Sequence, residues 1–202
     1  MNHLKLFVNI STSSVYGAKA TSTEEEAPRP ISNYGVTKLA AEQLVLSQQR
    51  LGVIKACSIR LFSVYGPRER PEKLYTKLIK SILEERPFPL YEGSEHHERS
   101  FTYVDDIIDG LMRVLELPES CNGELINLGN EAVYTTGEGI AIIESILQKK
   151  AQLQIAPKRA GDQLRTSATI DKARDLLNYH PSTTFEDGLR SQVAWYLEKF
   201  TS

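Results

Sequence analysis

The fold is decided by the stretch Leu4-Lys5-Leu6-Phe7-Val8-Asn9-Ile10, which opens an alternation of strand, loop, helix and strand. This nearly continuous apolar run is typical of a parallel strand that is buried on both faces. A second run of β-branched and apolar residues at 53–62 predicts another strand. Two strands joined through a helix form a βαβ unit, so the sequence indicates an α/β fold with a parallel sheet.

A helix is predicted between the two strands. Ser32 and Asn33 are typical of a helix start, and they follow a polar loop at residues 21–30. The helical period is kept by Val36, Leu39, Ala40, Gln43, Leu44 and Ser47. Gly52 fits the C′ position just beyond the last helical turn. The helix is therefore expected to end there and to return the chain to the second strand.

The remaining residues, 67–202, predict a smaller α+β region. Helices are predicted at residues 75–83, 104–117, 137–149, 170–177 and 185–200, and extended segments at 87–91 and 124–128. Asp105 and Asp106 stand in the first turn of one of these helices, where the helix dipole favours negative charge. We expect two parts, a βαβ unit at residues 1–66 and a second region at 67–202.

Composition excludes several classes of function. The 202 residues carry a net charge of −2, which argues against a nucleic-acid-binding surface, and no apolar run is long enough for a membrane helix. Cys57 and Cys121 have no metal-ligand or disulfide-framework spacing, so we expect a reducing, cytoplasmic setting. The acid run Glu24-Glu25-Glu26 lies in the polar loop, and we interpret it as solvated.

Chemistry is indicated by Tyr34 and Lys38, which stand four residues apart at the start of the predicted helix. This spacing places both side chains on one face, where a lysine cation favours the ionised form of a phenol and suits it to proton transfer. Polar, glycine-closed segments follow both strands, at residues 11–17 and 63–66. Ligands of open α/β sheets bind at these carboxyl ends of the strands, so a site is expected there.

With these motifs, the sequence resembles the extended short-chain dehydrogenase/reductases of the sugar-nucleotide epimerase/dehydratase group. The matching stretches occur in the family's order, at residues 10–17, 34–38, 60–70, 99–106, 127–130 and 161–162. The resemblance implies the C-terminal two-thirds of a Rossmann-type fold, with a partial Rossmann-type unit at 1–66 and mainly sugar-nucleotide binding at 67–202. It also implies NAD as cofactor, a UDP-sugar as substrate and a homodimer as the assembly.

The resemblance assigns the family's catalytic triad to Thr12, Tyr34 and Lys38. In the family, the tyrosine is the acid/base on the sugar 4-hydroxyl, the lysine holds the nicotinamide ribose, and the threonine positions the hydroxyl. Hydride passes from sugar C4 to NAD, and epimerases return it to the other face of the 4-keto sugar. Contacts with NAD are implied for Tyr34, Lys38, Phe62 and Val64.

Further matches imply how a sugar nucleotide would be held. Family dehydratases carry an acid pair after the threonine, but Ser13 and Ser14 stand here, which favours epimerisation. Substrate contacts are implied for Ser13, Ser63, Arg70, Tyr91, Arg99, Arg159 and Asp162. Ser63 and Arg70 match residues that hold a sugar carboxylate in UDP-glucuronate 4-epimerases, and an arginine fork suits a carboxylate. Tyr91 matches the aromatic residue stacked on uracil, and Arg99 and Arg159 match arginines that bind the diphosphate.

The family's N-terminal strand and its Gly-x-x-Gly-x-x-Gly loop have no counterpart in the 202 residues. That loop normally holds the NAD pyrophosphate, so we expect weak NAD binding and little activity from this chain alone. The leading hypothesis is a UDP-sugar 4-epimerase, with UDP-glucuronate as the candidate substrate. A dehydratase or decarboxylase of the same fold, and a sugar-nucleotide-binding remnant without catalysis, stay as alternatives.

Overall fold

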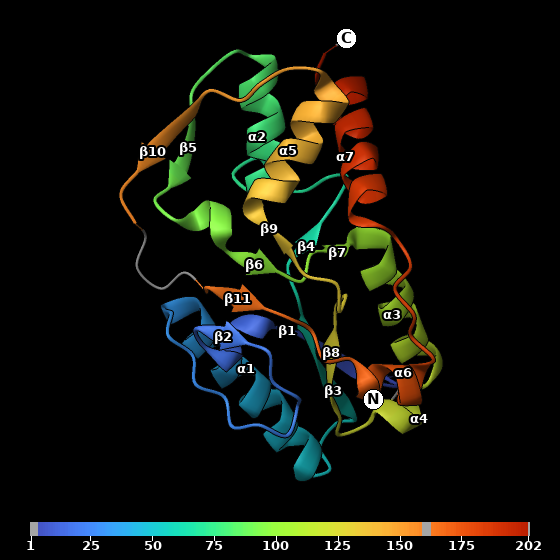
Figure 1. Ribbon diagram of the computed structural model, residues 1–202. Coiled ribbons are helices and arrows are strands. Elements are labelled where there is room, and N and C mark those ends of the chain that lie inside the picture. Colours follow the sequence, from blue (N-terminus) through green and yellow to red (C-terminus); the bar gives the residue numbers. More distant parts are fainter. Residues whose placement is uncertain (1–3, 159–162, 202) are drawn as a thin grey trace.

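The predicted βαβ unit forms the central sheet of the protein. The computed structural model describes residues 4–158 and 163–201. Strand β1 (Phe7–Thr12) pairs in parallel with β3 (Ala56–Leu61), and α1 (Asn33–Arg50) connects them. Strand β8 (Leu125–Leu128) is parallel to β3 on its other side, giving the order β1-β3-β8. This sheet and α1 lie in the lower half of the view in Figure 1. The α/β expectation is confirmed.

Strand β1 is at one edge of this sheet, and part of its apolar surface is exposed. The predicted strand at residues 4–10 was expected to be buried on both faces, yet Phe7 is 43% and Ile10 is 40% exposed. Full burial is found instead in the middle strand, where Ile59 and its neighbours are covered by both flanking strands. The run has the composition of an inner strand, but the sequence offered no partner strand for its other side, so an exposed apolar edge was expected as well. Among the described residues β1 pairs only with β3, and the exposed Phe7 and Ile10 agree with that expectation.

Both ends of α1 follow the sequence signals. The Ser32 side chain accepts a hydrogen bond from the Gly35 N–H at 3.1 Å, which is the expected N-cap. At the other end, Gly52 has φ of +70° and donates its N–H to the Gln49 carbonyl at 2.9 Å. A left-handed residue after the last turn is the role that glycine fills best. The start and end of α1 are therefore set by local chemistry.

A second layer packs beside the sheet. Helices α2 (Leu74–Leu83), α5 (Thr136–Leu147) and α7 (Phe185–Phe200) lie together in the upper half of Figure 1. Strands β5 (Phe88–Tyr91) and β10 (Leu153–Ala156) form a parallel pair beside them. The remaining elements are η1 (Ser13–Tyr16), β2 (Lys19–Ala20), β4 (Val64–Tyr65), η2 (Ser94–His96), β6 (Glu98–Arg99), β7 (Thr102–Tyr103), α3 (Val104–Glu116), α4 (Pro118–Cys121), β9 (Tyr134–Thr135), β11 (Arg165–Thr166) and α6 (Asp171–Leu177).

The buried apolar side chains form two clusters. One surrounds the central sheet and includes residues of α3 and α6, such as Val114 and Leu177. The other lies among α2, α5 and α7 and includes Phe101 and Phe185, whose rings stack with centroids 5.0 Å apart. Segments that follow residue 66 therefore belong to both clusters. The division of the chain at residue 66 stays a prediction.

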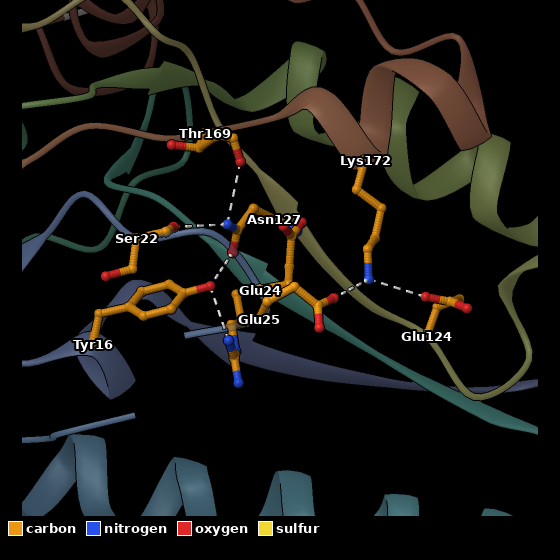
Figure 2. A network of polar contacts seen from close by, with 9 residues as sticks. Tyr16, Ser22, Glu24, Glu25, Glu124, Asn127, Thr169 and Lys172 are labelled. Atoms are coloured by element: carbon orange, nitrogen blue, oxygen red, sulfur yellow. Dashed lines mark hydrogen bonds and ion pairs between the residues drawn. The ribbon is translucent and has the colours of Figure 1, made fainter. Parts of the chain in front are cut away.

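The acid run is not simply solvated, which corrects the interpretation made from sequence. Glu24 is 8% exposed, and its Oε1 accepts a hydrogen bond from the Asn127 backbone N–H at 2.7 Å. Figure 2 shows this contact within a network around Asn127. The other edge of the sheet is β8, so Glu24 satisfies an N–H that no strand reaches. A carboxylate is stable when buried if such a donor meets it.

Both cysteines are free and buried, and burial raises the pKa of Cys57 to about 12 and of Cys121 to about 11. Within residues 4–158 and 163–201, no helix combines the length and apolar character needed to cross a membrane. In the same part of the chain, no three His, Cys, Asp or Glu side chains are grouped so that they could hold a metal ion. The two thiols are therefore core residues.

Candidate functional site

Three hydroxyl residues leave the end of β1 as a tight turn. Thr12 ends the strand and caps η1, since its Oγ1 accepts a hydrogen bond from the Ser14 N–H at 3.2 Å. The Thr12 hydroxyl also lies 3.3 Å from Ser14 Oγ. Thr12 and Ser13 are largely buried, with 9% and 4% exposure. This turn, residues 12–14, is called the hydroxyl turn below.

The hydroxyl turn contacts the first turn of α1. A Cβ on Gly35 would lie 2.7 Å from the Ser14 carbonyl oxygen, so only glycine permits this close approach. Tyr34 precedes that glycine and is 57% exposed, and Lys38 follows one turn later. The close packing at Gly35 therefore holds Tyr34 and Lys38 next to the hydroxyl turn, as the family resemblance requires.

These residues line one groove of about 600 Å³. Its lining includes the predicted site residues Thr12, Ser13, Tyr34, Lys38, Ser63, Val64 and Arg70. The structure thus brings the triad and the candidate carboxylate-binding residues together, although they come from three separate segments of the chain. We call it the triad groove.

A second cavity of about 350 Å³ contains Tyr91 and Arg99. It lies between α2 and β5, and its walls include the apolar side chains of Phe88 and Leu90. We call it the nucleotide cavity. The two spaces share five lining residues, which are Ser63, Val64, Tyr65, Glu69 and Lys73. A ligand could therefore extend from one space into the other.

The shared wall has features of a binding site. Ser63 has φ of +20°, at the edge of a region that is uncommon for residues other than glycine, and its carbonyl accepts a hydrogen bond from the Thr102 N–H at 3.2 Å. Burial raises the pKa of Tyr65, whose hydroxyl donates to the Phe185 carbonyl at 3.3 Å. Tyr65 is therefore a neutral wall residue, which leaves the far more exposed Tyr34 as the phenol suited to proton transfer in the groove.

Arg99 is fixed in the wall by its own contacts. Its Nη1 donates to the Glu98 carbonyl at 3.0 Å, and its Nη2 donates to the Gln163 carbonyl. Gln163 in turn donates from Nε2 to the Gly17 carbonyl at 2.7 Å and lines the triad groove. Gln163 thus connects the Arg99 side chain with the turn that follows β1. Gln163 was not predicted as a site residue, because a lone amide in a loop carries no pattern.

The three other predicted residues have different outcomes. The Phe62 side chain is fully buried in the core beside Tyr16 and lines neither space, so its prediction as a cofactor contact could apply only to its backbone. Arg159 and Asp162 lie outside the described residues. Two lining residues, Glu69 and Lys73, were not predicted as site residues. Charged residues in a polar loop have no periodicity that would have revealed them.

Comparison with known proteins gives a consistent result. A family model described as the NAD dependent epimerase/dehydratase family matches residues 1–129. An uncharacterized UDP-glucose epimerase of Bacillus subtilis is 38% identical over 193 residues, covering 95% of this chain and 60% of the relative. A UDP-glucuronate 4-epimerase of Thermodesulfobacterium geofontis is 34% identical over 198 residues, covering 96% of this chain and 60% of the relative.

Solved structures agree. The UDP-glucuronic acid 4-epimerase from Bacillus cereus, in complex with UDP-glucuronic acid and NAD, superposes with a TM-score of 0.92 at 37% identity. That alignment covers 98% of this chain and 64% of the other. A dTDP-glucose 4,6-dehydratase from Bacillus anthracis has a TM-score of 0.86 at 28% identity, over 95% of this chain and 61% of the other. The chain therefore spans about 60% of the length of these relatives.

Proposed function

The chain belongs to the NAD-dependent epimerase/dehydratase family, and we propose that it acts on a UDP-sugar as a 4-epimerase. The observation that carries this proposal is the shared wall between the triad groove and the nucleotide cavity. A sugar nucleotide has a reactive sugar at one end and a base at the other. The two adjoining spaces provide chemistry for each end, with Tyr34 in one and Tyr91 in the other.

Tyr34 is proposed as the group that takes and returns the proton of the sugar 4-hydroxyl. A phenol needs help to ionise near neutral pH, and the Lys38 ammonium one helical turn away provides an opposite charge. Thr12, held in the hydroxyl turn, would orient the same hydroxyl by hydrogen bonding. Together the three residues bind, orient and deprotonate one alcohol.

Epimerisation is favoured over dehydration because the described residues around Tyr34 offer no second acid/base suited to removing water. Removal of water from a sugar needs an additional acid/base, and Ser13 and Ser14 offer only hydroxyls. Of the described residues that line the triad groove, Glu69 is the one carboxylate. Its Oε2 is already occupied by hydrogen bonds from Thr76 and Gln192. The likeness to a dehydratase of 28% identity keeps that reaction as the alternative.

UDP-glucuronate is the proposed substrate. Arg70 lines the groove, and its guanidinium makes one long ion pair, 3.8 Å from Glu72, with both side chains at least 69% exposed. A guanidinium in that state can bind both oxygens of a sugar carboxylate. Ser13 and Ser63 would add hydrogen bonds to it. Relatives named UDP-glucuronate 4-epimerase support this choice.

The nucleotide end is assigned to Tyr91 and Arg99, which line the second cavity. Tyr91 would stack on the uracil and Arg99 would meet the diphosphate, with Arg159 and Asp162 as further predicted contacts. Lys73 lines both spaces, and a diphosphate that joins sugar to nucleoside would lie near this border. The Lys73 ammonium is a suitable partner for the charge of such a ligand.

The described residues fit one end of NAD, the nicotinamide ribose. Tyr34, Lys38 and Val64 line a groove wide enough for a ligand, and the phenol and ammonium are donors suited to a ribose. When bound, NAD would supply oxidation and reduction at sugar C4. For the pyrophosphate, by contrast, the 202 residues contain no glycine-rich Gly-x-x-Gly-x-x-Gly pattern. The proposed contacts are therefore limited to the nicotinamide ribose.

The proposal is tested by incubating the chain with UDP-glucuronate and NAD and following the sugar protons by NMR. Because little activity is expected without the glycine-rich loop, the NAD concentration is high, and slow inversion at C4 is expected. A 4-keto-6-deoxy product or loss of carbon dioxide would instead establish one of the alternative reactions. Saturable binding of UDP-glucuronate with no turnover, at any NAD concentration, would support a sugar-nucleotide-binding protein without catalysis.

A further inference from the structure

Residues 66–73, which we call the rim segment, border both spaces of the proposed site. Gly66 has φ of +136° and Arg68 has φ of +66°, and the latter is uncommon for a residue with a Cβ. Such a conformation persists only where surrounding contacts determine it. The rim segment also contains Arg70, the proposed partner of a sugar carboxylate, so its shape affects the site.

Glu69 holds this segment through hydrogen bonds from Thr76 and Gln192. Its Oε2 accepts from the Thr76 N–H at 3.2 Å and from Gln192 Nε2 at 2.9 Å. The Thr76 hydroxyl lies 3.1 Å from the same oxygen and 3.3 Å from the Glu69 carbonyl, and it donates to one of them. Hydrogen bonds to a carboxylate are stronger than those between neutral groups. The rim segment is thereby attached to α2 and α7.

Gln192 is placed for this contact. Its side chain is fully buried on α7, and its Nε2 also lies 3.0 Å from the Thr76 hydroxyl. Its Oε1 has no hydrogen-bond partner among the described residues, although it is buried. An unpaired buried oxygen is unfavourable, so the orientation of the amide is set by its donor side, which faces Glu69 and Thr76.

The attachment acts on the backbone on both sides of Arg70. The Glu69 N–H donates to the Gly66 carbonyl at 3.2 Å, and the Lys73 N–H donates to the Arg70 carbonyl at 3.0 Å. Two consecutive turns are therefore fixed, with the anchored carboxylate between them. The Arg70 guanidinium itself is held only weakly, by an exposed ion pair with Glu72 at 3.8 Å.

We propose that Glu69 is a positioning residue, which fixes the rim segment so that Arg70 can recognise a carboxylate on the sugar of a nucleotide substrate. This inference rests on the proposed function, since it assumes a uronate nucleotide in the triad groove. It assigns to Glu69 no direct contact with substrate. A negatively charged residue near an anionic ligand is tolerated because its charge is met by donors from α2 and α7.

The test is the affinity of the full chain for UDP-glucuronate and for UDP-glucose, measured by calorimetry. Glu69→Ala is expected to lower the preference for UDP-glucuronate about tenfold. This corresponds to losing about one hydrogen bond between Arg70 and the sugar carboxylate. Arg70→Ala should remove the same preference, and Glu69→Ala added to Arg70→Ala should lower it no further. If Glu69→Ala does not fold, as judged by circular dichroism, Gln192→Met weakens the same network.

The control is Glu144→Ala. Glu144 is also a largely buried carboxylate that accepts a backbone N–H, from Ala151 at 2.9 Å, but it lines neither space. It should lower stability without changing the ratio of the two affinities. If Arg70→Ala removes the preference while Glu69→Ala and Gln192→Met retain it, the positioning role is wrong. If the unaltered chain binds both nucleotides equally or not at all, the proposed substrate itself is wrong.

Discussion

Arg60 donates two hydrogen bonds to the carboxylate of Glu42, from Nη2 at 2.7 Å and from Nε at 3.0 Å. Both side chains are buried, with exposures of 1% and 0%. Glu42 lies on α1 one turn after Lys38, and Arg60 lies on β3. This pair therefore joins the helix that carries Tyr34 and Lys38 to the middle strand of the sheet.

Removal of one partner of this pair should be costly. Glu42→Ala leaves a buried guanidinium unpaired, and we expect the free energy of unfolding to fall by about 3–5 kcal/mol. Urea denaturation followed by circular dichroism measures the loss. The control is Glu119→Ala, which removes a largely exposed pair with Lys55 and should have a much smaller effect. Similar losses in both variants would contradict the role assigned to the buried pair.

Where turnover is measurable, Tyr34→Phe should lower it by about 10²–10⁴, the range for a general acid/base. Lys38→Met should act in the same direction, because it removes the cation that favours the phenolate. Initial rates of UDP-glucuronate conversion measure both effects. Tyr196→Phe is the control, since that tyrosine packs in the second apolar cluster and should leave turnover unchanged. Full activity of Tyr34→Phe would remove the triad assignment.

A polypeptide of these 202 residues is expected to bind NAD weakly. Its sequence lacks the glycine pattern whose N–H groups hold the pyrophosphate, and Tyr34 and Lys38 would reach only the ribose end. NAD released from the purified protein by denaturation can be quantified by chromatography. We expect far less than one equivalent, and a value near one would show that other residues hold the pyrophosphate.

The free edge of β1 should promote self-association. Strand β1 pairs with β3 on one side, and Phe7 and Ile10 are substantially exposed. Such an edge offers unpaired backbone groups to a second chain. Light scattering after size-exclusion chromatography should show a dimer or larger species, which Phe7→Lys weakens. Leu51→Lys, at an exposed position that follows α1 and is not part of β1, should leave it intact. A stable monomer at high concentration would contradict this.

The main helices could be predicted from the sequence because their signals are local. Ser32 and Gly52 mark the ends of α1 by capping chemistry that needs no tertiary context. The helix at Phe185–Phe200 was predicted with its observed bounds, since its apolar residues recur at helical spacing along the whole segment. Tyr34 and Lys38 were proposed from their spacing together with the family resemblance. They line one groove with Thr12, and their catalytic role stays a prediction.

What the sequence could not show depends on distant partners. Strand β10 was missed because Leu153 and Ile155 are exposed and its pairing with β5 brings together segments 65 residues apart, as from Phe88 to Leu153. Glu24 was taken as solvated because its donor, Asn127, lies on the far edge of the sheet. Glu69 was overlooked for the same reason, since Gln192 comes from the last helix. Charged residues in loops reveal their role only when the fold supplies their partners.

The central claim is that one UDP-sugar spans the triad groove and the nucleotide cavity. The most direct measurement is a crystal structure of the chain with UDP-glucuronate. We expect the uracil against Tyr91, the diphosphate near Lys73 and Arg99, and the sugar 4-hydroxyl within hydrogen-bond distance of Tyr34. A nucleotide bound with its sugar away from Tyr34, or in another part of the molecule, would contradict it.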